Sequence, residues 1–223
     1  MSFSRMVLAP WIVWVATGIA LVALAMAVSR RPWQALLQDH AMQHRWLAAT
    51  VAVTVLWQLR AQAVDWLTLH LMFTTLMTLL FRAPLALVSL ALVNLALVLV
   101  GRVEWPMLGV NLLVTGVVPV LVTVAMWRWV DRCLPKHPMV FLFVGGFWCA
   151  ALSSLAAGLA VLGLMALGSS DPQAMFQAQE YARFLPLLMP SEAFISGMLL
   201  SILMFHHPHW VATFNDQRYL DDR

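Results

Sequence analysis

Residues 83–100 read APLALVSLALVNLALVLV, a run of 18 residues without a charged side chain. Such a run is typical of a membrane-spanning helix, because about 20 apolar residues cross the roughly 30 Å hydrocarbon core of a bilayer. Similar apolar stretches occur on both sides of it, at about residues 7–28, 46–60, 64–81, 107–130, 138–167 and 185–205. The sequence therefore predicts an all-α, polytopic helical bundle with about seven transmembrane helices, in which residues 1–223 form a single membrane domain.

The overall composition points to the same class of protein. Of the 223 residues, 62% are hydrophobic and 10% are charged, against roughly half and a quarter in an ordinary soluble domain. Cys133 and Cys149 lie in no CxxC or Cys/His pattern, which excludes a disulfide framework. There is no Walker A, GxSxG, HExxH or GxGxxG motif, and no basic patch with interleaved aromatic residues. We therefore expect neither an enzyme nor a nucleic-acid-binding protein, and any ATP would be hydrolysed by another chain.

The basic residues predict how the chain is oriented in the membrane. Nine of the 13 Lys and Arg residues fall on one side, in alternate loops (29–45, 82 and 131–137), in the tail 206–223 or, for Arg128, at a helix end. Because cytoplasmic loops carry the excess of basic residues, we expect the N-terminus outside and the C-terminus in the cytoplasm. Residues 206–223 would form a short cytoplasmic tail of a multi-pass protein in the inner (plasma) membrane. The nine residues are Arg30, Arg31, Arg45, Arg82, Arg128, Arg132, Lys136, Arg218 and Arg223.

His70 is an ionisable residue inside a predicted span, near the outer end of 64–81. Ionisable groups are expensive in a bilayer, so those present often mark functional sites. A neutral imidazole at this position could bind a transition metal, with Asp65 or Met72 contributing. The alternative is an interfacial histidine that hydrogen-bonds to a neighbouring backbone carbonyl. The sequence leaves both interpretations open.

Glu192 lies at the start of the last apolar stretch, in the sequence PSEA (190–193). Ser191 fits an N-cap, and Glu192 fits the first helical turn, where the helix dipole favours an anion. Alternatively, Glu192 is a buried carboxylate that receives a cation or pairs with an arginine such as Arg60. Asn111 is a lone amide in another apolar stretch, which is typical of an interhelical hydrogen bond.

Three histidines form the sequence HHPH at residues 206–209, after the last apolar stretch. Such a cluster could hold a metal ion. However, Pro208 breaks the helical spacing that would bring two imidazoles onto one face. A juxtamembrane position without a metal is the alternative.

Four short segments occur in the order found in a known family. They are MSFSRMVLAP (1–10), His70 with Leu71, GVNLLVTGVV (109–118) and SEAFIS (191–196). They resemble the segments MHIPDGYLSP, HLL, GANVxNMGxV and GEALIT of the substrate-binding membrane subunits of energy-coupling factor transporters for cobalt and nickel, the CbiM/NikM-like group. The chain thus resembles a divergent branch of these permeases.

The resemblance implies a metal site at the N-terminus. In the family the N-terminus enters the helical bundle from outside, and its terminal amine, the backbone nitrogen and imidazole of residue 2, and a further histidine bind the metal. Here the ligands would be Met1, the Ser2 backbone and His70, with Met72 as a further candidate. Ser2 replaces the family's imidazole and also favours removal of Met1, which would move the terminal amine out of register.

The resemblance also implies a substrate, partners and supporting residues. Co²⁺ or Ni²⁺ would be the transported ion, with no tightly bound cofactor. A transmembrane coupling protein and cytoplasmic ATPase subunits would drive uptake. Asn111 would order the N-terminal segment or the site, and Glu192 would supply buried negative charge or a helix-locking ion pair.

Two further classes of function remain as alternatives. One is a membrane subunit that binds haem or copper for redox or assembly, although bis-histidine haem needs two facing intramembrane imidazoles and His70 alone lies within a predicted span. The other is a scaffold that has lost its metal site, an alternative that rests on Ser2.

Overall fold

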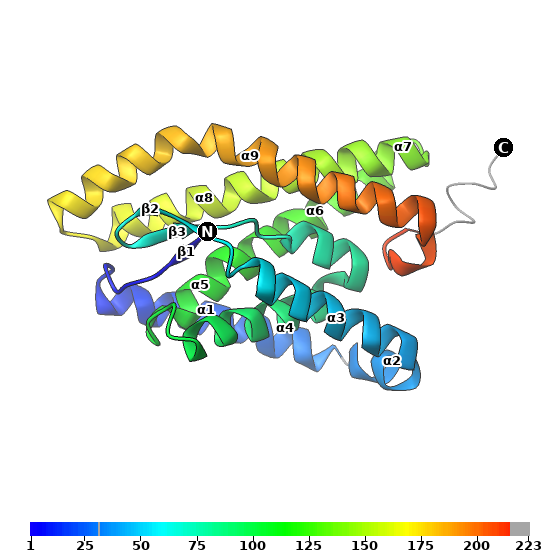
Figure 1. Ribbon diagram of the computed structural model, residues 1–223, viewed down its shortest axis with the longest axis horizontal. Helices are drawn as coiled ribbons and strands as arrows, with labels where there is room; N and C mark the ends of the chain where they lie inside the picture. Colours follow the sequence, from blue (N-terminus) through cyan, green and yellow to red (C-terminus); the bar gives the residue numbers. More distant parts are fainter. Residues whose placement is uncertain (31, 215–223) are drawn as a thin grey trace.

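The computed structural model of the protein describes residues 1–30 and 32–214 and is a bundle of roughly aligned helices (Figure 1). Five helical segments of the described residues are long and apolar enough to cross a membrane. They are α1 (Pro10–Ser29), α4 (Thr74–Leu99), Met107–Cys133, Pro138–Gly168 and α9 (Pro172–His206). The count of seven spans therefore stays a prediction, as does the orientation. Arg31, Arg218 and Arg223, three of the residues on which the orientation was predicted, lie outside the described residues.

Two of the long segments are composite, and several shorter elements complete the chain. The segment Met107–Cys133 consists of α5 (Met107–Asn111), the π-helical η1 (Leu112–Val117) and α6 (Val118–Cys133). The segment Pro138–Gly168 consists of α7 (Pro138–Val140), the π-helical η2 (Phe141–Trp148) and α8 (Cys149–Gly168). The short helices are α2 (Pro32–Gln38), α3 (His40–Leu56) and η3 (Pro208–Trp210).

Helix α4 is folded back on itself at Arg82. Arg82 has φ 63° and ψ 163°, a backbone conformation that interrupts the helix. The Thr74 hydroxyl donates to the Thr115 carbonyl at 2.7 Å, and the Asn94 amide donates to the Thr115 hydroxyl at 3.2 Å. Twenty residues of straight helix would separate Thr74 from Asn94 by about 30 Å, so the chain must reverse between them. The first arm (74–81) and the second arm (83–99) agree with the predicted boundary between 64–81 and 83–100.

The prediction that 64–81 is one helical span is wrong in its first part. Strands β2 (Ala61–Val64) and β3 (Leu67–Leu69) form an antiparallel hairpin, and helix begins only at Thr74. Strand β1 (Ser2–Phe3) pairs with the other side of β3, which gives the order β1-β3-β2. The short apolar run around β3 fits a buried strand as well as a helix, so the fold contains a small sheet that the all-α prediction omitted.

The prediction that the last helix begins near residue 185, with Ser191 as its N-cap, is also wrong. Helix α9 begins at Pro172, where the Asp171 carboxylate accepts from the Gln173 N–H at 2.9 Å. Ser191 lies in its interior and its hydroxyl donates to the Leu188 carbonyl at 2.8 Å. Prolines inside membrane-spanning helices are tolerated where neighbouring groups satisfy the freed carbonyls, so Pro190 did not mark a helix start.

The segment that follows α9 packs back against the first arm of α4. The backbone N–H groups of Ala212 and Thr213 donate to the carbonyls of Leu80 and Leu79, each at 3.2 Å. The Arg82 guanidinium donates to the Ala212 carbonyl at 3.2 Å. These bonds satisfy carbonyls that the helix break leaves free. Within the predicted tail of 206–223, residues 215–223 lie outside the described residues.

Candidate metal site at the N-terminus

The N-terminal segment enters the interior of the bundle as an edge strand, and Figure 1 shows the N-terminus among the helices. Ser2 pairs with Thr68 and Phe3 with Leu67 in the β1–β3 ladder. Both Ser2 and Phe3 are fully buried, and the Phe3 ring stacks on Trp66 with 5.5 Å between centroids. The hairpin therefore holds the first three residues at a defined position inside the protein.

Asn111 fixes the free edge of the same strand. Its side-chain oxygen accepts from the Phe3 N–H at 2.7 Å, and its side-chain nitrogen donates to the Phe3 carbonyl at 2.9 Å. Asn111 is the last residue of α5 and adjoins the π-helical η1, a type of irregularity that is frequent at functional sites. The lone amide thus bonds to the N-terminal strand rather than to another helix.

His70 lies between β3 and α4, outside the helical part of its predicted span. Its Nε2 is 3.0 Å from the Met1 amino nitrogen, and its Nδ1 is 3.2 Å from the Leu71 carbonyl oxygen. A carbonyl oxygen only accepts, so Nδ1 carries the proton and Nε2 presents its lone pair to Met1. Metal-binding histidines commonly donate their other ring N–H in this way. The predicted bond to a backbone carbonyl is present, and it leaves Nε2 free to act as a ligand.

The side chain of Met1 is buried and contacts α9. It is 3% exposed, and its sulfur accepts a hydrogen bond from the Tyr181 hydroxyl at 2.8 Å. The amino group also lies 3.4 Å from the His70 carbonyl oxygen. The thioether therefore points to α9 while the amine points to His70, so the two ends of this residue are anchored separately.

Burial sets the protonation of the two nitrogens that face each other. Desolvation lowers the pKa of the Met1 amino group from 8.0 to about 5, and it lowers the pKa of His70 well below its usual 6.5. At neutral pH both groups are therefore uncharged and carry lone pairs. Metal ligands must be deprotonated, so this pair needs no proton release from the amine or the imidazole to bind a cation.

Ser2 contributes its backbone rather than an imidazole. Its hydroxyl lies 2.9 Å from the Thr68 hydroxyl. Because Ser4 N donates to Trp66 O and bonded pairs alternate in an antiparallel ladder, the Ser2 N–H is directed at the Thr68 carbonyl. The backbone nitrogen could coordinate a metal only by leaving that strand bond.

Glu192, on α9, binds the backbone of the segment between His70 and α4. Its two carboxylate oxygens accept from the backbone N–H groups of Met72 and Phe73, each at 2.8 Å, and Ser196 donates to one of them at 3.1 Å. Glu192 is 4% exposed. It caps the start of α4, where Phe73 has φ 55°. In the described part of the chain it forms no ion pair with Arg60.

Trp57 is a site residue that the sequence analysis missed. Its ring lies against the His70 ring, with 4.1 Å between centroids, and its indole N–H donates to the Met72 carbonyl at 3.3 Å. Thr68 and Tyr181 were missed as well. Their contacts join residues that are distant along the chain, so no local pattern marks them.

The remaining candidates form no hydrogen bond with this pair in the described residues. Asp65 accepts from the Gln177 side chain at 3.2 Å. Met72 is buried, with both main-chain polar groups hydrogen-bonded. The histidines of 206–209 lie at the end of α9 and just after it, where His207 stacks on Trp210. Over residues 1–30 and 32–214, no three His, Cys, Asp or Glu side chains come together in a metal-binding group.

Comparison with known proteins identifies a family and a solved structure of similar fold. Residues 3–210 match the family described as the CbiM cobalt uptake substrate-specific transmembrane region. A crystal structure of a truncated transition metal transporter has a similar fold, with a TM-score of 0.71 and 18% identity over 93% of this chain and 100% of that chain. No curated protein matches the sequence significantly.

Proposed function

This chain belongs to the CbiM family of cobalt-uptake transmembrane proteins, and from that premise we propose that it is the substrate-binding permease subunit of an energy-coupling factor type transporter. It captures a transition-metal ion, Co²⁺ or Ni²⁺, at the buried N-terminus. ATP is hydrolysed by partner subunits. The same proposal locates the protein in the inner (plasma) membrane.

The observation that carries the proposal is the pair of nitrogens that face each other at the N-terminus. The Met1 amine and His70 Nε2 are 3.0 Å apart and are held by different elements, β1 and the segment before α4. A cation that binds between them replaces one hydrogen bond with two coordinate bonds. Nitrogen ligands suit nickel, copper and other late transition metals better than they suit Mg²⁺ or Ca²⁺.

The rest of the ligand set differs from the family pattern because residue 2 is serine. The Ser2 backbone nitrogen is the third ligand in this proposal. Its N–H would leave Thr68 and give up its proton to solvent when the metal binds. The Met72 thioether is the candidate for a fourth, softer ligand. A site with one imidazole and one thioether would therefore differ from a site with two imidazoles in its relative affinity for Ni²⁺ and Co²⁺.

Helix α4 links the metal site to the segment after α9, which partner subunits could contact. The first arm of α4 begins beside the site, at Thr74, and ends at the carbonyls that bind Ala212 and Thr213. A coupling protein or ATPase that moves the segment after α9 would therefore act on a helix that starts four residues after His70. Uptake by the chain with and without these partners tests this part of the proposal.

A glycine placed before Met1 should weaken binding of Ni²⁺ or Co²⁺ at least about tenfold, because it converts the free amine into an amide and moves the new terminus about 3.8 Å along the chain. Calorimetric titration of the purified full chain measures the effect. Intact-protein mass establishes that Met1 is present in both samples. Equal affinities of the two forms would remove the amine from the site.

No observation favours the haem alternative. The ring of His70 contacts Trp57 and the Met1 amine, and in the described residues no second histidine stacks on it or bonds to it. The alternative of a scaffold without a site predicts that neither form binds a transition metal, so the same titration tests it.

A further inference from the structure

A groove of about 630 Å³ runs between α1, the second arm of α4 and the η1–α6 helix. Its apolar walls are open to the surroundings: Val15 and Val22 on α1 are 54% and 59% exposed, and Leu121 on α6 is 63% exposed. These residues belong to segments that are long and apolar enough to span a membrane. The groove therefore opens to the hydrocarbon of the bilayer, and whatever fills it must be apolar along most of its length.

Two arginines close one end of this groove. Arg30 follows Met26 by four residues and Arg128 follows Val124 by four, and all four residues line the groove. Residues four apart lie on one helix face, so each arginine continues an apolar wall. Arg30 directly follows the end of α1, and Arg128 lies near the end of α6. The two arginines thus line the groove near the C-terminal ends of α1 and α6.

Neither guanidinium has a partner within the described residues. The ion pairs there join Arg45 to Asp39 and Arg183 to Glu180. Asp131 follows Arg128 on α6 but does not line the groove. Two unneutralised positive charges at the mouth of an apolar groove attract a ligand with an anionic end and an apolar body.

The length of the apolar wall fits one leaflet of a bilayer. Val15 and Met26 are eleven residues apart in α1, which is about 16 Å of helix. Half of the roughly 30 Å hydrocarbon core is about 15 Å. A lipid acyl chain lying along this wall would place its headgroup at the level of Arg30 and Arg128.

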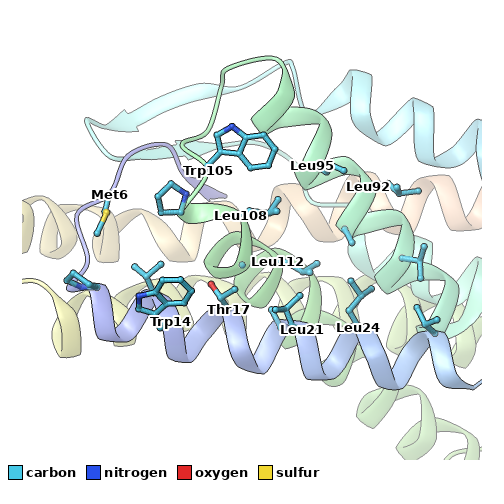
Figure 2. Close-up of a pocket in the computed structure, with 18 residues that line it drawn as sticks. Met6, Trp14, Thr17, Leu21, Leu24, Leu92, Leu95, Trp105, Leu108 and Leu112 are labelled. Carbon is cyan, nitrogen blue, oxygen red and sulfur yellow. The ribbon is translucent and has the colours of Figure 1, made fainter.

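A neighbouring groove offers an internal comparison. It has a volume of about 780 Å³, lies on another face of α1 and is walled by α4 and α5 (Figure 2). Leu21 and Leu24 from α1 and Leu92 from α4 line it, with Thr17 as a polar contact and no charged side chain. Any lipid tail could lie in this groove, whereas the groove with Arg30 and Arg128 selects by charge.

We infer that the groove between α1, α4 and α6 is a binding site for an acidic phospholipid, whose acyl chain lies along Val15–Met26 and whose phosphate lies between Arg30 and Arg128. A zwitterionic headgroup carries its own cation and leaves part of the arginine charge unneutralised. This site is separate from the N-terminal metal site and does not depend on the proposed function. Basic pockets between membrane-spanning helices are suited to such headgroups.

Native mass spectrometry of the full chain in detergent tests the site, with phosphatidylglycerol and phosphatidylcholine of identical acyl chains added in equal amounts. We expect about a 25-fold preference for phosphatidylglycerol, since each of the two basic side chains at the headgroup contributes roughly fivefold. The double variant R30Q/R128Q should lose this preference. The control variant R132Q removes one arginine charge from the exposed last turn of α6, outside the groove, and should keep this preference.

The tail contact is tested separately with Gly18→Phe. Gly18 lines the groove, and a Cβ added there meets no atom within 4 Å, so there is room at this position for a side chain to enter the groove. It should weaken phosphatidylglycerol binding while the arginines remain. Equal retention of the two lipids by the unaltered chain, an equal loss in R132Q, or displacement of the lipid by inorganic phosphate at the same concentration would each overturn the inference.

Discussion

Replacing His70 with alanine should lower the affinity of the purified chain for Ni²⁺ and Co²⁺ by at least about a hundredfold. Even residues that only orient a metal ligand contribute roughly 10- to 100-fold to affinity, and His70 Nε2 is the imidazole nitrogen that faces the Met1 amine at 3.0 Å. Calorimetric titration in detergent measures the change. The loss should be similar for both metals, because the same nitrogen serves both.

The control for this substitution is His44→Ala. His44 is an exposed histidine on α3, so its removal tests the effect of losing an imidazole from the surface. Alanine at position 70 also removes the ring that contacts Trp57, and His70→Gln keeps more of that volume with no imidazole. Unchanged affinity in both His70 variants, or an equal loss in His44→Ala, would exclude His70 as a ligand.

Replacing Glu192 with alanine should destabilise the protein by about 3–5 kcal/mol. The substitution leaves the buried N–H groups of Met72 and Phe73 without acceptors, and each unsatisfied buried group costs about 1–3 kcal/mol. Glu192→Gln keeps one acceptor oxygen and should have a smaller effect. Thermal unfolding in detergent, followed by tryptophan fluorescence, measures the order of stability.

Glu180→Gln is the matched control for Glu192, since it makes the same change on the same helix. Glu180 is exposed and pairs with Arg183 at 3.4 Å, and an exposed ion pair of this kind contributes at most about 1 kcal/mol. Metal affinity should fall with Glu192→Ala as well, because the two anchored residues directly follow the His70-Leu71 segment. If Glu192→Gln and Glu180→Gln unfold at the same temperature, Glu192 does not hold this segment.

The helical part of the fold follows largely from local sequence. The apolar runs at 107–130 and 138–167 agree with helical segments at Met107–Cys133 and Pro138–Gly168, because bilayer thickness fixes the length of such runs. The run at 46–60 agrees less well, since α3 begins at His40, where the Asp39 carboxylate accepts from the Met42 N–H. Because the first turn of α3 is polar, a search for apolar runs places the start of this helix too late in the sequence.

The site depends on contacts that no local pattern contains. Strand β3 pairs locally with β2, but Ser2 and Phe3 add the third strand to it from more than sixty residues away. The sequence alone offered Glu192 a place in the first turn of its own helix or a role as a buried carboxylate, whereas its carboxylate caps α4 across 120 residues of chain. The resemblance to CbiM proteins is confirmed by the family match. It pointed to the N-terminus and His70, but Thr68 and Tyr181, which hold Ser2 and Met1, become visible only in three dimensions.

The central claim is that a transition-metal ion binds between the Met1 amine and His70. X-ray absorption at the metal edge, on the full chain loaded with one equivalent of Ni²⁺, tests it most directly. The account predicts a first shell of nitrogen ligands and the outer-shell scattering of one imidazole. In His70→Ala the imidazole scattering should disappear. The same imidazole signal in both samples, or a shell of water oxygens alone in the unaltered chain, would contradict it.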